Sequence, residues 1–374
     1  MTQAALYINS KGYAVTRHSY SGSSDFNHCA RYYSLKRISG WQERKQSAAM
    51  KFGSILENCV TKFHASDLAG ALKEFEGLWG GEKNNTELVF SKNEGDWDDL
   101  NLSGQELLRL YAILYPRFEF TVPGPTAFQV KCSMEMFPGT PLAGLETWAY
   151  LDLIAKLKTG SFDPSLPSSE VILDMKVSTA ECPTLISLDP QLRLYSWIRG
   201  IPTVGFLWFG KESRTLAKGT EVTLLEAVGP FKPGSKGYIL SLDKGDIPIA
   251  PPSVYLAPGT TTLEEFDKIE GQSKAAKEAR QKFIQEHGII VPIASITRQT
   301  ITVRTTVISE ESRRDIRRSV EQDIVRIVHA SEEDFFPMQG GVRFPNNKCT
   351  MCAMRGICSG NDALRDELLV RITE

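Results

Sequence analysis

Two charged residues, Asp174 and Lys176, stand in an otherwise apolar segment of this 374-residue chain. In Val171–Val177 every second residue is apolar, and the residues between them are Ile172, Asp174 and Lys176. A period of two predicts a β-strand that carries both charged side chains on one face. Burying a charged side chain on a core strand destabilises the folded state unless an opposite charge pairs with it, so such a residue has either a pairing partner or a function. The segment is therefore either a local ion pair at a strand end or part of a catalytic site.

A second carboxylate, Asp152, lies within the apolar run Glu146–Leu157. This run also predicts a core strand, so Asp152 and Asp174 would lie on paired strands. Two carboxylates on neighbouring strands form a hard-oxygen site that suits Mg²⁺ or Mn²⁺. Such an ion can polarise a phosphate and activate a water. Lys176 would orient that water or neutralise charge that develops on the phosphate.

Two helical pairs flank these strands in the sequence. Gln191 and Tyr195 have i, i+4 spacing, which places them one turn apart on one helix face. Gly53 and Glu57 have the same spacing, and a glycine one turn before an acid lets a ligand approach closely. Each pair also has a structural interpretation, since Glu57 could be a solvated surface acid and Tyr195 a core aromatic residue.

The order of these groups along the chain is Gly-x3-Glu, Gly…Asp, Asp-x-Lys and Gln-x3-Tyr. This order resembles that of the PD-(D/E)XK nuclease superfamily, and within it the RecB/AddB-like branch. The resemblance covers about Ser19 to Trp197 and resumes near the C-terminus. One position departs from the branch, because RecB-type members usually carry His where this chain has Glu57.

The resemblance implies a role for each residue. Glu57, Asp152 and Asp174 would bind the metal, and Lys176 would be catalytic. Gln191 and Tyr195 match the family's additional motif, which is associated with DNA contact and with support of the active site.

Three cysteines, Cys349, Cys352 and Cys358, are clustered near the C-terminus. A tetrahedral zinc site or a cubane cluster needs a fourth ligand. The segment around Cys29 is similar to that of the superfamily's iron–sulfur members, the AddB-type and cluster-bearing CRISPR-associated nucleases. The resemblance implies that Cys29 completes a [4Fe–4S] cluster joining the two ends of the chain. Zinc, with His28 as a substitute ligand, is the alternative.

The elements that would position these residues can be read from the pattern of apolar residues. We expect helices over Lys51–His64, Leu68–Trp79, Ser103–Leu114, Gln191–Arg199, Thr262–His287 and Glu310–Ala330. The first has an apolar stripe from Phe52 to Phe63, and Asp67 is placed to cap the second. A capping box at Ser103–Glu106 would begin the third, and Asp189 followed by Pro190 would begin the fourth. We expect strands over Phe128–Met136, Glu146–Leu157, Glu170–Val177, Thr203–Phe209, Glu221–Val228, Tyr238–Leu242 and Thr300–Val307. The segments Gly80–Leu102 and Ile247–Pro258 are expected to be surface loops.

The expected fold is α/β, with a restriction-endonuclease-like central mixed sheet flanked by helices. We divide the chain into a part over residues 1–210, with the Cys29 segment and the nuclease core, an elaboration over 211–300, and a C-terminal part over 301–374. The last part would contain a strand, a helix and the clustered cysteines, and would pack back on the core.

Composition restricts the class of protein. The net charge of −2 argues against a protein that coats nucleic acid non-specifically, and it is compatible with a nuclease, whose basic groove can be local. The N-terminal residues lack the apolar core of a signal peptide, and no apolar run is long enough to cross a membrane. Seven cysteines, an odd count, argue against a disulfide framework. We expect a cytoplasmic protein.

These observations lead to one main hypothesis of function. The chain would be a metal-dependent DNA exonuclease that acts on single-stranded DNA or free ends, in recombination, repair or phage replication, with recombination or replication proteins as partners. Two alternatives stay open: a nuclease-fold DNA-binding protein without catalysis, and a restriction-like endonuclease whose specificity domain would occupy Glu212–Gln299.

Overall fold

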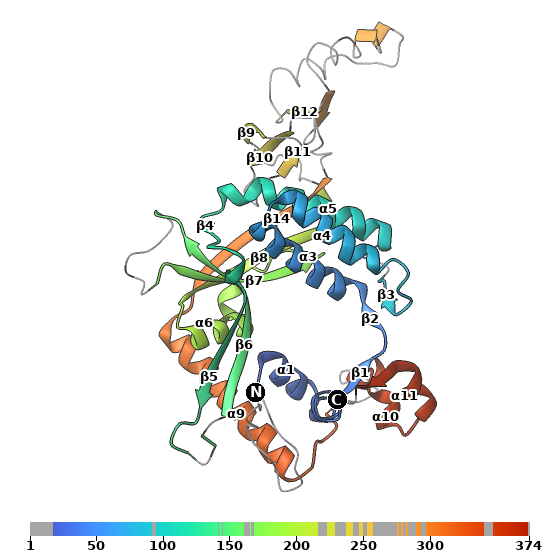
Figure 1. Ribbon diagram of the computed structural model, residues 1–374, viewed down its shortest axis with the longest axis vertical. Helices are drawn as coiled ribbons and strands as arrows, with labels where there is room; N and C mark the ends of the chain where they lie inside the picture. Colours follow the sequence, from blue (N-terminus) through green and yellow to red (C-terminus); the bar gives the residue numbers. More distant parts are fainter. Residues whose placement is uncertain are drawn as a thin grey trace.

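A mixed β-sheet forms the centre of the molecule in the computed structural model (Figure 1). The structure describes residues 18–91, 95–140, 142–143, 145–160, 165, 168–215, 297–339 and 347–372, and between 216 and 296 only 223–228, 237–241, 247–249, 253–256, 275–276, 278–279, 282 and 289–292. The strand order is β14-β8-β7-β6-β4, and β5 also pairs with β6. The strands are β4 (Phe120–Thr121), β5 (Phe128–Met136), β6 (Leu145–Leu157), β7 (Glu170–Ser178), β8 (Thr203–Thr215) and β14 (Thr297–Val307).

The sheet is mixed because β7 and β8 are parallel, whereas β6 and β7, β5 and β6, and β8 and β14 are antiparallel. It curls, so that β5 and the paired half of β6 turn away from the plane of β7 and β8 (Figure 1). The predicted α/β class with a central mixed sheet is confirmed, and so are the strands expected over Phe128–Met136, Glu146–Leu157 and Glu170–Val177 to within one residue.

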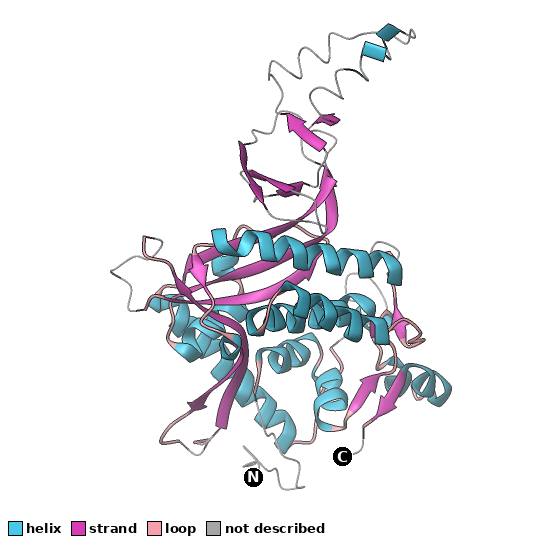
Figure 2. Ribbon diagram, turned by 45° about the horizontal axis from the view of Figure 1, so that its top comes forward, coloured by secondary structure: helices cyan, strands magenta, loops and turns pink. Residues whose placement is uncertain are grey.

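Three helices cover one face of the sheet, and the strands, magenta in Figure 2, have helices on both sides. These helices are α3 (Ala48–Ala65), α4 (Leu68–Gly81) and α5 (Trp97–Leu114). Their apolar stripes pack on Leu153, Leu173 and Leu207 in one buried cluster. The side chain of Asp67 caps α4, as its position predicts, by accepting a hydrogen bond from Gly70 N at 2.8 Å.

The prediction that α5 begins at Ser103 was wrong. Asp96 caps the helix and forms a capping box with Asp99, so six residues of the expected loop are helical. Ser103 is buried within the helix instead of capping it.

Two helices cover the other face, α6 (Pro190–Arg199) and α9 (Glu310–Glu332). Their buried side chains pack with Ile172, Val204 and Phe206 in a second cluster. Asp189 caps α6 by accepting a hydrogen bond from Leu192 N at 2.9 Å, and Pro190 occupies the first turn, as expected. The helix ends at Gly200, whose φ of 74° is the left-handed conformation that glycine adopts at low cost.

The two ends of the chain meet at one side of the molecule (Figure 1). The antiparallel pair of β1 (Trp41–Glu43) and β15 (Leu369–Arg371) joins them, with Trp41 opposite Arg371. Leu35, Met354 and Leu369 form a small core beside this pair. The nearby helices are α1 (Tyr20–His28), α2 (Ala30–Tyr33), a π-helix (Ser34–Ile38), α10 (Arg355–Cys358) and α11 (Asp362–Leu368). Strand pairing thus joins the segment around β1 to the C-terminal strand β15.

The segment between β8 and β14 contains short strands. They are β9 (Thr223–Val228), β10 (Gly237–Ser241) and β11 (Ile247–Ile249) in one sheet, and β12 (Ser253–Leu256) paired with β13 (Ile289–Pro292). The prediction of a loop over Ile247–Pro258 was therefore wrong. The helix expected over Thr262–His287 lies mostly outside the described residues. No helix in the described part of the chain is long and apolar enough to cross a membrane.

Candidate active site

The central sheet splits between β6 and β7, at Asp152 and Asp174. Pairing of these strands ends with Leu153 opposite Leu173, so Asp152 and Asp174 are the next pair in register. Beyond this point β6 continues beside β5 and β7 continues beside β8. Past the end of this backbone pairing, the side chain of Asp152 bridges the two strands, since its Oδ2 accepts a hydrogen bond from Met175 N at 2.9 Å. The two acids therefore face each other across the fork of the sheet.

Asp174 is completely buried. Neither of its oxygens accepts a hydrogen bond of good geometry from the described residues. Its one close charge contact is with Lys176, whose Nζ lies 2.6 Å from Asp174 Oδ2. Burial raises the pKa of Asp174 to about 7; Lys176 opposes this increase and the charge of Asp152 adds to it. A buried carboxylate with unsatisfied oxygens has the chemistry of a cation ligand.

Glu57 reaches the fork from α3. Burial raises its pKa to about 7, and the charge of Asp152 contributes to this increase. Burial also raises the pKa of Asp152. Glu57, Asp152 and Asp174 thus form a group of carboxylates that repel one another, with Lys176 as the nearby positive charge.

Gln129 is a member of the site that the sequence reasoning missed. Its Nε2 donates hydrogen bonds to Glu57 Oε1 and, at 3.3 Å, to Asp152 Oδ1. Phe128 opposite Leu153 and Val130 opposite Leu151 place Gln129 directly across from Asp152. Its φ of 50° is unusual for a residue other than glycine and often marks a functional position. Only its position opposite Asp152 could have identified Gln129, and that position is known only once the register of β5 on β6 is known.

The side chains of α6 close the opposite side of the site. Gln191 Oε1 accepts a hydrogen bond from Lys176 Nζ at 3.5 Å, and Gln191 Nε2 donates to the hydroxyl of Tyr195. Tyr195 is buried, and burial raises its pKa. The structure thus links both α6 residues to Lys176.

A pocket of about 420 Å³ lies between α3, the fork and α6, and its lining includes Glu57, Asp152, Asp174, Lys176 and Gln191. Gly53 also lines it, but a side-chain carbon at Gly53 would lie 3.9 Å from Val177, an ordinary contact, so the backbone does not require glycine there. Among the described residues, no three His, Cys, Asp or Glu side chains stand close enough to hold a metal ion as they are. The Gln129 amide lies between two of the three acids. The donor set nevertheless suits a hard divalent cation, because it consists of carboxylate oxygens, and Asp174 Oδ1 is buried without a hydrogen bond from the described residues.

The cysteine residues of the predicted cluster come from both ends of the chain. Cys29 is buried, and its Sγ accepts a hydrogen bond from Gln339 N at 3.5 Å. Burial raises the pKa of Cys352 and Cys358, and in each case the charges of Cys29 and Cys349 add to the increase. All four thiols are free and are electrostatic neighbours, without the geometry of a closed metal site in this part of the described chain. His28 is exposed and its ring packs edge-on against Tyr32.

Comparison with known proteins gives one decisive match. The family model of the PD-(D/E)XK nuclease superfamily matches residues 17–359, which include every residue of the site and the four cysteines. No curated protein matches the chain. A crystal structure of a "Putative exonuclease" from Eubacterium rectale is 13% identical, with a TM-score of 0.34 over 96% of this chain and 90% of that chain. This score is too low to support an argument about fold or function.

Proposed function

The chain belongs to the PD-(D/E)XK nuclease superfamily, and from that premise we propose that it is a divalent-metal-dependent DNA exonuclease. The family makes it a nuclease, a hydrolase of phosphodiester bonds. The observation that carries the catalytic proposal is the fork, where Asp152 and Asp174 face each other beside Lys176 and the pocket. A nuclease-fold protein without catalysis would have no need to keep this costly group of charges.

Superfamily members generally use Mg²⁺ or Mn²⁺. In our proposal Glu57, Asp152 and Asp174 hold the cation, which when bound polarises the phosphate and lowers the pKa of a water. Burial lowers the pKa of Lys176, but the close contact with the Asp174 carboxylate raises it, as do the charges of Asp152 and Asp189, and the net shift is upward. Lys176 therefore stays protonated and acts as a positive charge toward the phosphate, not as a general base.

Gln191 and Tyr195 act on Lys176 in this proposal. The hydrogen bonds from Lys176 to Gln191, and from Gln191 to Tyr195, restrict the ammonium group to one side of the pocket. A fixed ammonium group stabilises charge in the transition state better than a mobile one, because it need not reorganise during the reaction. Gln129 holds Glu57 and Asp152 in place from the other side.

We infer that the substrate is single-stranded DNA or a free DNA end, in recombination, repair or phage replication in the cytoplasm, with proteins of those processes as partners. Linear and circular single-stranded DNA, incubated separately with Mg²⁺ or Mn²⁺, test the proposal. We expect loss of end-labelled linear DNA and no loss of circles. Cutting of circles would instead identify an endonuclease.

The matched variants are Asp174→Ala and Glu106→Gln, the latter an exposed carboxylate on α5. We expect Asp174→Ala to abolish cleavage and Glu106→Gln to retain it. Equal cleavage by wild type and Asp174→Ala would refute the assignment of the site. Binding of DNA without cleavage under every metal condition would favour the non-catalytic alternative.

We also propose that Cys29, Cys349, Cys352 and Cys358 hold a [4Fe–4S] cluster that reinforces the β1–β15 junction. The proximity of the four free thiols supports it. Anaerobic purification, visible absorption and metal analysis test it, with Cys358→Ser against Cys182→Ser, a half-buried cysteine away from the group. Iron and a broad visible band should be lost only in Cys358→Ser. A colourless protein with zinc would show the alternative occupant.

A further inference from the structure

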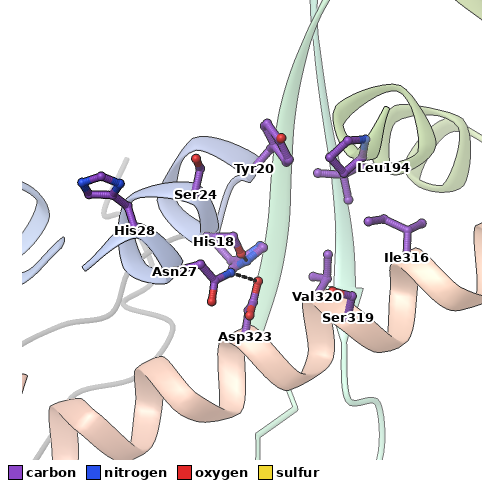
Figure 3. A pocket seen from close by; sticks show the side chains of 12 residues that line it. His18, Tyr20, Ser24, Asn27, His28, Leu194, Ile316, Ser319, Val320 and Asp323 are labelled. Carbon is purple, nitrogen blue, oxygen red and sulfur yellow. Dashed lines mark hydrogen bonds between the residues drawn. The ribbon is translucent and has the colours of Figure 1, made fainter. Parts of the chain in front are cut away.

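A second pocket, of about 400 Å³, lies between α1, α6 and α9 (Figure 3). Figure 3 shows Tyr20 of α1, Leu194 of α6, and Ile316 and Val320 of α9 around one hollow. The mechanism proposed above uses none of these side chains. The volume lies at the lower end of the range for sites that bind small organic ligands.

This pocket adjoins the active site. Its lining includes Pro190 and Leu194, and the same helix α6 carries Gln191, which lines the active-site pocket. The Tyr20 hydroxyl is close enough to Asp189, Lys176 and Asp174 for their charges to influence its pKa, which burial raises. A DNA strand whose reacting phosphate lies at Lys176 would therefore place a neighbouring nucleotide beside Tyr20.

The polar groups at the base of the pocket are occupied by one another. Asp323 accepts a hydrogen bond from Asn27 Nδ2 at 2.9 Å and forms an ion pair with Arg326 at 3.4 Å (Figure 3). His18 bonds to Ser23 and Thr147, and burial lowers its pKa to about 4, so its ring is neutral at pH 7. What stays available is an apolar wall, the rings of Tyr20 and His28, and the exposed hydroxyls of Ser24 and Ser319.

The described lining contains no Lys or Arg, while it does contain Asp323. A phosphate would meet the carboxylate of Asp323, and the nearby Arg326 is already paired with that carboxylate, so the pocket does not suit the DNA backbone. A flat aromatic ring with polar edges suits it, since tyrosine and aliphatic side chains stack on a base and rim hydroxyls can bond its edge.

We propose that this pocket is a subsite for one nucleobase of an unpaired DNA strand, beside the nucleotide that is cleaved. A base within a duplex is stacked and cannot enter, so the subsite would select single-stranded or frayed DNA. The inference rests on the proposed nuclease function and specifies how its substrate is held.

Binding can be measured apart from cleavage. A short fluorescein-labelled oligothymidylate is titrated in EDTA, and its anisotropy is followed. Ser319→Trp, at an exposed rim position, fills the pocket, and Gln322→Trp, exposed on the same helix but outside the pocket, is the matched control. Tyr20→Ala removes the stacking ring and Tyr20→Phe keeps it. We expect Ser319→Trp and Tyr20→Ala to weaken binding by about 5- to 150-fold, and Tyr20→Phe and Gln322→Trp to bind like wild type.

An oligothymidylate with one abasic position tests occupancy by a base. The abasic site is placed at each position in turn. At one position it should weaken the binding of the oligonucleotide to the wild type. At that same position it should leave the binding to Ser319→Trp unchanged. Cleavage of the intact oligonucleotide with Mn²⁺ should fall in Ser319→Trp, whereas cleavage of the oligonucleotide that lacks the base at this position should be the same in Ser319→Trp and the wild type. Equal binding by Ser319→Trp and Gln322→Trp, or an abasic site without effect at every position, would overturn the subsite. The nuclease proposal itself fails only if the wild type does not cleave.

Discussion

Replacing Asp174 by Asn should make the metal-free protein more stable while it abolishes activity. The carboxylate is completely buried, and burial raises its pKa to about 7, against an ordinary value of 3.8. A pKa difference of this size corresponds to about 4 kcal/mol at most, as a penalty on the ionised form in the folded state. Asn has nearly the same shape and no charge to bury.

The sign of the pH dependence follows from proton linkage. With its pKa raised in the folded state, Asp174 binds more protons when folded than when unfolded between about pH 4 and pH 7. The folded state therefore loses stability as the pH rises through this window, and the penalty is complete above pH 7. Lys176 loses its partner in the variant, but its side chain is 39% exposed, so that loss is small. We expect Asp174→Asn to gain about 2–4 kcal/mol at pH 8 and little near pH 4.

Urea unfolding in EDTA, followed by tryptophan fluorescence over this pH range, measures the difference. Glu106→Gln is the control, because an exposed carboxylate on α5 should give no pH-dependent gain. Adding Mn²⁺ should then stabilise the wild type and not Asp174→Asn, because only the wild type has the complete set of carboxylates. A variant less stable than the wild type at pH 8, or a difference that does not grow with pH, would refute the reasoning.

Other expectations concern the groups around Asp174. Gln129→Ala should destabilise the metal-free protein by about 1–3 kcal/mol in urea unfolding, since two carboxylates lose a donor, and Gln129→Gly should cost less because glycine accepts a φ of 50°. Lys176→Met should lower kcat about 100-fold or more and leave Mn²⁺ affinity, measured by calorimetry, within a few-fold. Gly104→Ala should lower the thermal midpoint, with a loss of about 1–3 kcal/mol, because the added methyl group would collide with the ring of Phe75.

The sequence predicted correctly the features that depend on a single helix or strand. The period of two in Val171–Val177 predicts opposite faces, and in the structure Leu173 packs with α3–α5 whereas Ile172 packs with α6 and α9. The apolar stripe of α3 and the Asp189-Pro190 start of α6 are equally local, and both were predicted correctly. Helix caps and periodicity depend on residues only a few positions apart.

The sequence placed Asp152 and Asp174 on paired strands, but it did not determine the register of those strands. Asp152 faces Asp174 only because of the register of β6 on β7, and Gln129 faces Asp152 only because of the register of β5 on β6. The alternating apolar pattern of a strand is compatible with several registers on its neighbour, since a shift by two residues keeps the same side chains on the buried face. The start of α5 was missed for a different reason, since Ser103 offered a plausible capping box and Asp96 offered the one that forms. Packing decides between competing local signals, and in the helix that forms Leu100 is buried in the core cluster with α3 and α4.

The fork explains why these acidic side chains can be close together without a flexible loop to carry them. A sheet normally holds paired residues through its ladder, but here the ladder between β6 and β7 ends at Leu153 and Leu173, and space opens beyond it. Each diverging strand keeps a partner on its other side, so Asp152 and Asp174 stay on rigid backbone while their carboxylates face the opening. The cost is electrostatic, since burial raises the pKa of both acids and of Glu57. A divalent cation would offset this electrostatic repulsion, so the repulsion among the three carboxylates would itself favour binding of the metal.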